Sequence, residues 1–330
     1  MEYRQLGESD LKVSAITFGA WAIGGWMWGG TERKDAVQAI RASVDEGVTS
    51  IDTAPIYGQG LSEEITGEAL KGIDRSKVQI LTKFGMRWDL EKGTLAFKSK
   101  DNDGKDIDIY KYAGKESVIL ECENSLKRLG TDYIDLYQIH WPDVTTPVNE
   151  TFEAVLRLKE QGKVREVGVC NYNVSLMKDA DSIVKLASNQ VPFSMVERAI
   201  EEELVPYTIA NKKGILAYSP LQRGILTGKI APGHKFGEGD HRPATKFYQP
   251  ENLKRINAFL DEIRPMAESK SVSLAQLVIR WTIDRPGITA ALVGARNAEQ
   301  AIQNARAINV KLSAEEIKFI NDRLYKVELV

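Results

Sequence analysis

The sequence has few cysteines and no strong excess of charge of either sign. Cys122 and Cys170 are the only cysteines among 330 residues. Two thiols cannot form a disulfide framework, so we expect the protein to work in a reducing cytoplasm. The formal net charge is -2, which gives the chain no overall attraction for polyanions. We therefore expect no nucleic-acid partner.

The sequence also lacks a hydrophobic run long enough to anchor it in a membrane. The one long uncharged stretch, residues 14–30, is shorter than the ~20 residues that a spanning helix needs. It contains five glycines, so a strand followed by a loop explains it better. No basic segment followed by an apolar one marks the N-terminus as a signal peptide. We expect neither a membrane association nor a secretion signal.

No Gly-x-Gly-x-x-Gly follows an expected strand, so a Rossmann domain is not indicated. Short apolar runs instead alternate with amphipathic helical segments along the whole chain. Alternating strands and helices form parallel sheets through right-handed crossovers, and eight strands favour closure into a barrel. We predict a single (β/α)8 TIM-barrel domain over residues 1–330. Its strands are expected near residues 15–18, 48–51, 78–82, 133–139, 164–169, just before 190, 215–218 and 289–293.

Two connections are much longer than the others. One runs from about residue 85 to 115, after the third strand, and the other from about 222 to 250, after the seventh. Loops that follow barrel strands lie at the C-terminal rim, where the active sites of such barrels lie. Structureless stretches of this length commonly act as lids or binding loops. We therefore predict two long loop insertions at this rim.

Reactive side chains end three neighbouring strands of the predicted barrel. Asp52, Lys83 and His140 end the second, third and fourth strands, and Tyr57 follows Asp52 in the next loop. A phenol has an ordinary pKa of about 10, and a nearby ammonium lowers it. A carboxylate would hold that ammonium, and an imidazole would orient a substrate oxygen. Together these groups suit protonation of an alkoxide during carbonyl reduction.

Each of these side chains also has an ordinary explanation when taken alone. An aspartate can form a turn, a tyrosine can pack in a loop, and a histidine is more often structural than catalytic. Lys83 could be a surface charge, or the Schiff-base lysine of a barrel aldolase. The convergence of all four on adjacent strand ends favours a functional site.

Four groups of motifs, in this order along the chain, resemble the aldo-keto reductase family. The chain is most similar to bacterial general-stress and inositol-operon reductases, which are relatives of the potassium-channel β subunits. The resemblance implies NADPH-dependent reduction of aldehydes or ketones, with Tyr57 as general acid, Lys83 and Asp52 tuning it, His140 positioning the carbonyl, and no metal. The motifs are Asp52-Thr53-Ala54-x-x-Tyr57-Gly58 with Ser62-Glu63, Thr82-Lys83, Asp132-Tyr133-Ile134-Asp135-Leu136 with His140-x-Pro142-Asp143, and Gly168-Val169-x-Asn171.

The same resemblance implies an extended NADPH across the barrel mouth. Asn171 and Gln190 would bind the nicotinamide carboxamide, and the segment from Tyr218 would stack on the ring. Arg296 would pair with the ribose 2′-phosphate, whose geometry a guanidinium matches; alternatively it caps or solvates the last helix. The implied cofactor residues are Ala20, Trp21, Asp52, Cys170, Asn171, Gln190, Tyr218, Ser219, Pro220, Leu221, Gly224, Leu226, Lys229, Gly294, Ala295, Arg296, Gln300 and Asn304.

Two positions depart from the family pattern. Cys170 stands where serine is usual, and a thiol is a weaker hydrogen-bond partner. An exposed thiol there would make the site oxidisable. Phe193 and Ser194 replace a usual Tyr-Asn pair, which would alter how the cofactor or substrate packs.

Five of the six tryptophans fall in loops after strands, whereas Trp281 lies on a helix and is expected in the core. Aromatic walls with a few polar groups are typical of small-molecule sites. We predict a preference for apolar or aromatic aldehydes, such as substituted benzaldehydes or methylglyoxal-type dicarbonyls. The predicted substrate-pocket residues are Trp21, Trp28, Trp88 and Trp141.

Two other functions stay open at this point. One is an aldolase that forms a Schiff base on Lys83. The other is a cofactor-binding regulatory subunit that senses redox state, as channel β subunits are thought to. A small-molecule carbonyl substrate is the expected partner, and the sequence does not indicate an oligomeric state.

Overall fold

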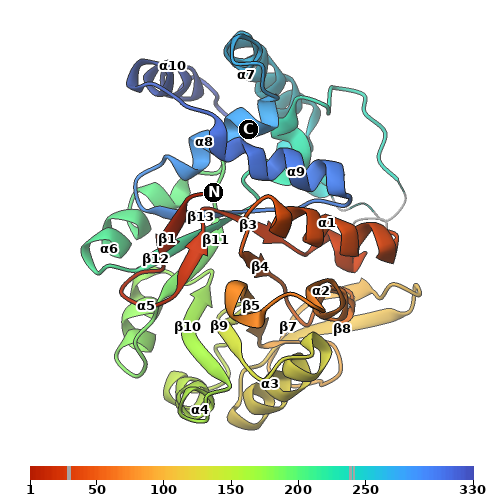
Figure 1. Cartoon of the computed structure of the whole chain (residues 1–330), viewed down its shortest axis with the longest axis vertical. Helices are drawn as coiled ribbons and strands as arrows, with labels where there is room; N and C mark the ends of the chain where they lie inside the picture. Colours follow the sequence, from red (N-terminus) through yellow and green to blue (C-terminus); the bar gives the residue numbers. More distant parts are fainter. Residues whose placement is uncertain (28–30, 238–239, 241) are drawn as a thin grey trace.

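Eight parallel strands close into a barrel in the computed structural model, which describes residues 1–27, 31–237, 240 and 242–330 (Figure 1). The predicted (β/α)8 fold is confirmed, because each predicted strand overlaps an observed one. The last strand pairs with the first, which leaves the barrel without an open edge. In order around the barrel the strands are β3 (Ile16–Gly19), β4 (Ser50–Asp52), β5 (Gln79–Phe84), β9 (Ile134–Ile139), β10 (Val164–Cys170), β11 (Ser188–Pro192), β12 (Gly214–Tyr218) and β13 (Ile288–Val293).

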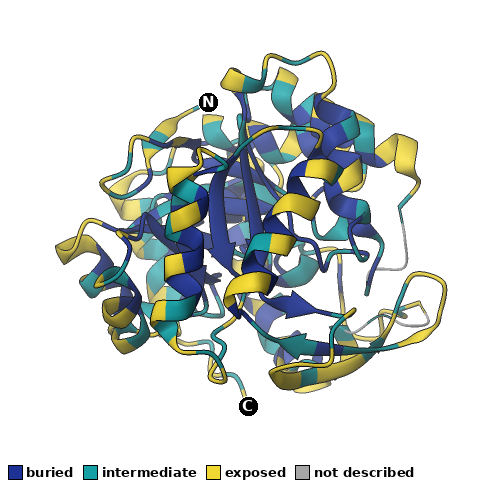
Figure 2. Cartoon of the chain, turned by 90° about the horizontal axis from the view of Figure 1, so that it is seen from below, coloured by how far each residue is buried: buried dark blue, intermediate teal, exposed yellow. Residues whose placement is uncertain are grey.

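Helices surround the strands, with their buried faces toward the strands and their exposed faces outward (Figure 2). In the first, for example, Ala36, Ala39 and Ile40 share one buried face at helical spacing. No helix in the described ranges is both long enough and apolar enough to cross a bilayer. The helices are α1 (Arg33–Asp45), α2 (Leu61–Leu70), α3 (Lys115–Leu129), α4 (Val148–Glu160), α5 (Val174–Asp181), α6 (Leu204–Ala210), α7 (Pro250–Ser269), α8 (Leu274–Ile283), α9 (Ala298–Arg306) and α10 (Ala314–Leu324).

An N-terminal hairpin that we did not predict fills one end of the barrel. Strands β1 (Tyr3–Gln5) and β2 (Lys12–Ser14) pair antiparallel. Leu6, at the hairpin turn, is fully buried among leucines from the barrel interior. Burying such a side chain contributes about 1.5–3 kcal/mol. The N-terminal end of the barrel is therefore closed by apolar side chains.

The first insertion is ordered, so our expectation of a structureless loop was wrong. Strands β6 (Met86–Arg87), β7 (Thr94–Lys100) and β8 (Asp106–Lys111) form an antiparallel sheet in the order β6-β8-β7. Alternating aspartate and isoleucine at 106–109 is the period-2 pattern of a strand with one buried face. In its described residues, the second insertion has only short 3₁₀ turns before α7.

Candidate active site

Strands β4 and β5 place an aspartate and a lysine side by side at the C-terminal end of the barrel. Lys83 Nζ donates to Asp52 Oδ1 at 2.6 Å and to the carbonyl oxygen of Thr53 at 2.8 Å. Burial is the largest single effect on the pKa of Lys83 and lowers it, but the nearby charges, that of Asp52 first, and the hydrogen bond to Asp52 together outweigh burial and raise the pKa. Lys83 is therefore a buried cation that a carboxylate holds in place.

Tyr57 lies against this ion pair. Lys83 Nζ is 4.9 Å from the centre of the Tyr57 ring, and the His140 ring meets the same ring edge-on at 5.6 Å. Burial raises the pKa of Tyr57 to about 12, although the charge of Lys83 lowers it in part. Our expectation of a lowered pKa was wrong for this chain, because the cost of burying a phenolate outweighs the attraction of the ammonium. Tyr57 consequently keeps its proton at neutral pH.

His140 follows β9 and is electrically neutral. Its backbone N–H donates to the carbonyl oxygen of Phe84 at 2.9 Å, which fixes the residue against the end of β5. Burial, with a smaller effect of the Lys83 charge, lowers the pKa of His140 well below its ordinary value. A neutral imidazole can donate a hydrogen bond to a substrate oxygen without adding a second buried cation beside Lys83.

Two glutamines that face the barrel interior complete the polar surroundings of the aspartate. Gln190 Nε2 donates to Asp52 Oδ2 at 2.7 Å, and Gln138 Nε2 lies 3.4 Å from the same oxygen. Gln190 was predicted to bind a carboxamide, yet its amide nitrogen contacts Asp52. The sequence analysis missed Gln138, because this polar residue inside a largely apolar strand belongs to none of the motifs.

A buried glutamate braces the strands from behind. Glu63 Oε1 accepts from the Thr82 hydroxyl at 2.6 Å, and Glu63 Oε2 accepts from Arg128 Nε at 2.7 Å. The neighbouring Ser62 hydroxyl donates to the carbonyl oxygen of Ala20 at 2.8 Å. The Ser62-Glu63 motif therefore supports the ends of β3 and β5 and does not contact the reacting groups.

A second polar pair lies at the ends of β10 and β12. The Tyr218 hydroxyl donates to Asn171 Oδ1 at 3.0 Å, and Asn171 Nδ2 donates to the His140 carbonyl oxygen at 3.1 Å. Asn171 and Ser219 both have positive φ, 60° and 57°. Such conformations in residues other than glycine are strained and tend to occur at functional sites.

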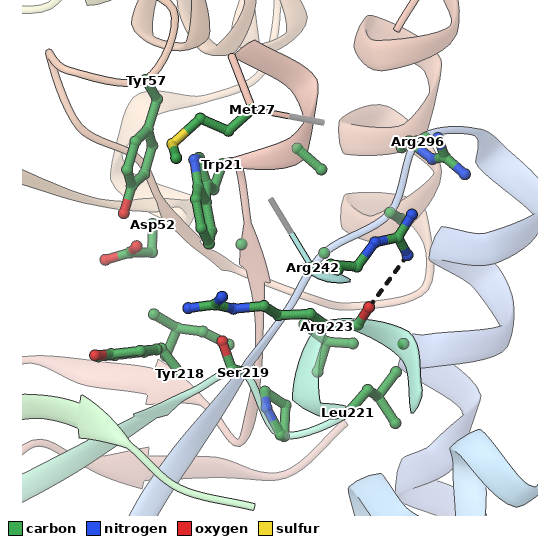
Figure 3. Close-up of a pocket in the computed structure, with 18 of the residues that line it drawn as sticks. Trp21, Met27, Asp52, Tyr57, Tyr218, Ser219, Leu221, Arg223, Arg242 and Arg296 are labelled. Carbon is green, nitrogen blue, oxygen red and sulfur yellow. Dashed lines mark hydrogen bonds between the residues drawn. The ribbon is translucent and has the colours of Figure 1, made fainter. Parts of the chain in front are cut away.

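These groups share one cavity of about 840 Å³ at the C-terminal end of the barrel (Figure 3). Lys83 is not at its surface and lies beneath it, bonded to Asp52. Ala20 and Leu226 were predicted to bind the cofactor, but both are fully buried behind the lining, Leu226 in the apolar core. The predicted catalytic and cofactor-binding residues that line the cavity are Trp21, Asp52, Tyr57, His140, Cys170, Asn171, Gln190, Tyr218, Ser219, Pro220, Leu221, Gly224, Lys229, Gly294, Ala295, Arg296, Gln300 and Asn304.

An arginine that the sequence analysis missed projects into this cavity. Figure 3 shows the Arg223 side chain extending from the turn after β12 toward Trp21 and Tyr218. Its guanidinium carbon lies 5.9 Å from the centre of the Trp21 ring. Arg223 has φ 55°, and the Tyr248 hydroxyl donates to its carbonyl oxygen at 2.8 Å. The only sequence signal was a basic residue directly before the predicted Gly224.

Arg296 lies at the far end of the cavity, where α9 begins. Asn297 is the N-cap of this helix, because its side-chain oxygen accepts from the Gln300 backbone N–H at 2.9 Å. Arg296 therefore does not cap the helix. Within the described part of the chain its guanidinium is exposed and makes no hydrogen bond or ion pair.

A model of the aldo/keto reductase family matches residues 15–324. The chain belongs to the aldo/keto reductase family. Members of this family are oxidoreductases that reduce carbonyls with a nicotinamide cofactor. This family membership agrees with the resemblance of the motifs and with the closed barrel.

Named relatives of this reductase match almost the whole chain. It is 38% identical to aldo-keto reductase YhdN of Bacillus subtilis (strain 168), over 97% of this chain and 93% of the relative. It is 33% identical to the NADH-specific methylglyoxal reductase of Escherichia coli (strain K12), over 98% of each.

Solved structures of the family share the fold. Glycerol dehydrogenase AKR11B4 from Gluconobacter oxydans matches with a TM-score of 0.87 and 35% identity, covering 98% of this chain and 95% of that one. The holo form of aldo-keto reductase AKR11C1 from Bacillus halodurans matches with a TM-score of 0.79 and 27% identity, covering 100% and 98%.

The tryptophans of the reductase divide between the cavity and the core. Trp21 and Trp141 line the cavity as predicted, and so does Trp26. Trp88 is not among the described lining residues; it is partly buried and packs against the apolar cluster that contains Trp26, Ile56 and Met86. Trp28 lies outside the described residues. Trp281 is fully buried, as predicted.

Neither departure from the family pattern exposes a new group in the reductase. Cys170 lines the cavity with only 1% of its surface exposed, and burial raises the pKa of its thiol. The expectation of an exposed, oxidisable thiol was therefore wrong. Phe193 stacks on Trp281 in the core, with 6.0 Å between ring centres. It does not contact the cavity in the described structure.

Proposed function

We propose that this reductase uses NADPH to convert aldehydes or ketones to alcohols, with Tyr57 as the proton donor. One observation carries the proposal. A protonated phenol, a buried ammonium and a neutral imidazole meet at one end of a cavity of about 840 Å³. When bound, the cofactor supplies a hydride from nicotinamide C4 to the carbonyl carbon.

The side chains divide the proton chemistry among them. His140 donates a hydrogen bond to the carbonyl oxygen and orients it toward Tyr57. The Tyr57 hydroxyl gives its proton to that oxygen as negative charge develops there. Lys83 stabilises the phenolate that remains. Asp52 holds the Lys83 ammonium in place through a hydrogen bond of 2.6 Å from Nζ to Oδ1. Each group therefore acts where charge appears during the reaction.

The rest of the cavity suits a phosphorylated dinucleotide. Its described lining carries basic side chains at Arg223, Lys229, Arg242 and Arg296, of which Arg242 is paired with Asp240. The single acidic side chain of the described lining, Asp52, is paired with Lys83. Charge-assisted hydrogen bonds from such groups bind phosphate strongly. The exposed guanidinium of Arg296 at the far end favours a 2′-phosphate, and thus NADPH over NADH. One relative is named as NADH-specific, so the preference of this chain for NADPH over NADH has to be measured.

A Schiff-base aldolase fits the geometry poorly. A lysine must be neutral to attack a carbonyl, whereas the surroundings of Lys83, with Asp52 as the main contributor, raise its pKa despite burial. Lys83 Nζ also donates to two oxygens below the cavity surface. The site thus keeps this amine charged and occupied.

Consumption of NADPH with a panel of aldehydes tests the proposal, with Tyr57→Phe as the comparison. We expect turnover by the native chain and little by the variant, with NADPH binding retained in both. Full activity of the variant would overturn the assignment of the acid. Tight NADPH binding with no turnover of any carbonyl would favour a regulatory subunit. Borohydride trapping of a substrate on Lys83 would favour the aldolase.

A further inference from the structure

An aromatic pair forms the side of the cavity that the inserted sheet covers. Phe97 on β7 stacks on Trp26 from the loop after β3, with 6.1 Å between ring centres and 15° between ring planes. Both residues line the cavity. Phe97 keeps 38% of its surface exposed, although it is a large apolar side chain. An exposed aromatic ring at the mouth of a cavity is typical of a surface that a ligand covers.

The apolar surface continues from this pair down to the proton donor. Ile56 and Met86 are buried beside Trp26 and line the same side of the cavity. Tyr57 packs against the same cluster. We call Trp26, Ile56, Met86 and Phe97 the aromatic wall. A carbonyl placed at Tyr57 would therefore have its substituent lying along this wall.

The aromatic wall is held rigidly by hydrogen bonds between the inserted sheet and the loop after β3. Trp26 Nε1 donates to Ser99 Oγ at 3.1 Å and to the Lys100 carbonyl oxygen at 3.0 Å. At the tip of the hairpin, Asn102 Nδ2 donates to the Gly24 carbonyl oxygen at 2.9 Å. A surface fixed before the ligand arrives loses little entropy on binding.

The chemistry of the wall selects one class of substituent. We infer that the inserted hairpin, through Phe97 stacked on Trp26, selects carbonyl substrates with a planar aromatic substituent, such as substituted benzaldehydes. Aromatic rings gain from offset stacking beyond the burial of their area. The four wall residues offer no strong side-chain acceptor, and their one donor, Trp26 Nε1, is already bonded to Ser99 and Lys100. A polyhydroxylated or dicarbonyl substrate would therefore leave its polar groups unpaired there. This inference rests on the proposed function and names its substrate class.

A substitution of Phe97 tests the inference against a matched control on the same strand. The next residue, Lys98, points to the opposite face, with 78% of its side chain exposed. We would measure kcat/KM for a substituted benzaldehyde and for methylglyoxal in the native chain, Phe97→Ala, Phe97→Tyr and Lys98→Ala. We expect Phe97→Ala to lose about tenfold or more for the benzaldehyde, mainly through KM. Methylglyoxal should be affected little, Phe97→Tyr should restore the benzaldehyde, and Lys98→Ala should match the native chain.

Equal losses on both substrates, no loss on either, or a native preference for methylglyoxal would overturn the inference and leave the proposed function standing. Absence of turnover with every carbonyl would instead count against the proposed function. Calorimetric titration with benzyl alcohol needs no turnover and tests the wall independently. Binding weakened by Phe97→Ala and unchanged by Lys98→Ala would support the inference, and identical affinities in all three chains would refute it.

Discussion

Lys83 Nζ lies 2.6 Å from Asp52 Oδ1, and the two side chains are only 0% and 4% exposed. Removing one partner of such a pair leaves an unpaired buried charge, which costs about 3–5 kcal/mol. We therefore expect Lys83→Met to lower the free energy of unfolding by this amount. The double variant Asp52→Leu with Lys83→Met should recover part of the loss, because no lone charge remains. Urea unfolding of the single and double variants measures this, and fully additive losses would contradict it.

Replacing the proton donor should slow the reaction without weakening cofactor binding. General acid catalysis contributes typically 10²–10⁴-fold, so we expect Tyr57→Phe to reduce kcat by about that factor. The stability should change little, because the phenyl ring keeps its place beside His140. Tyr325→Phe is the matched control, since Tyr325 is 74% exposed and is not among the described residues that line the cavity. A loss of similar size in both variants would show that the effect is not chemical.

The pH dependence of reduction should lack a step near the ordinary pKa of histidine. Burial raises the pKa of Tyr57 to about 12 and lowers that of His140 well below about 6.5. The donor thus stays protonated and the imidazole stays neutral through the neutral range. The same shift affects stability. Below about pH 6.5 the unfolded chain binds a proton at His140 and the folded chain does not, so the free energy of unfolding decreases as the pH falls.

The profile of kcat/KM against pH in the reductive direction provides the check. We expect a flat curve through pH 6.5. A step there that disappears in His140→Asn would mean that the imidazole titrates normally.

A buried glutamate below the inserted sheet should make stability depend on pH in the opposite sense. Glu121 accepts from the Gly85 backbone N–H and from the Ser117 hydroxyl, each at 3.0 Å. Burial raises its pKa to about 8 despite Arg87. The folded chain therefore holds a proton that the unfolded chain releases above pH 4.5. The stabilisation that protonated Glu121 gives the folded chain is fully present below pH 4.5 and is lost as the pH rises through 8.

Glu121→Gln removes this ionisation and keeps the shape of the side chain. Its free energy of unfolding, relative to the native chain, should rise between pH 5 and 8 by at most about 1.4 kcal/mol per pH unit. Above pH 8 the difference should become constant. Urea unfolding at a series of pH values measures it. A difference that does not vary with pH would show that Glu121 ionises normally.

Arg296 should separate NADPH from NADH. A hydrogen bond to a charged group contributes about 1.5–3 kcal/mol, so Arg296→Ala should weaken NADPH binding by about tenfold or more. NADH has no 2′-phosphate and should bind unchanged. Arg306→Ala, at the C-terminal end of the helix that follows Arg296, is the control, because Arg306 pairs with Glu46 on the surface. Equal affinities of the native chain for the two cofactors would remove NADPH preference from the proposed function.

The barrel and the four catalytic candidates could be predicted from sequence because both depend on short-range patterns. Buried parallel strands appear as apolar runs, and polar residues directly after them must meet at one rim. The hairpin β1–β2 could not be found this way, because strands of three residues carry too little pattern. The alternation of aspartate and isoleucine at 106–109 is a strand pattern. We did not predict strand β8 because the polar residues of this segment made it resemble a loop. A single domain and a cytoplasmic location stay predictions.

Side-chain direction and burial explain what the sequence could not predict about the site. Arg223 has a positive φ and its side chain enters the cavity, and the residue type alone indicates neither. Phe97 lines the cavity only because β7 folds back over the loop after β3. For Tyr57, the sequence indicated the neighbouring ammonium, but the pKa also depends on burial, which here acts in the opposite direction and is larger.

The inserted strands β6, β7 and β8 form a sheet separate from the barrel, whose own strand β5 ends at Phe84. The hairpin of β7 and β8 can therefore be exchanged without breaking the hydrogen bonds of the barrel. Another hairpin of similar span, grafted between Gly93 and Tyr112, would change what the mouth accepts and leave the barrel ladder intact. A family of reductases with different preferences could arise in this way on one unchanged scaffold.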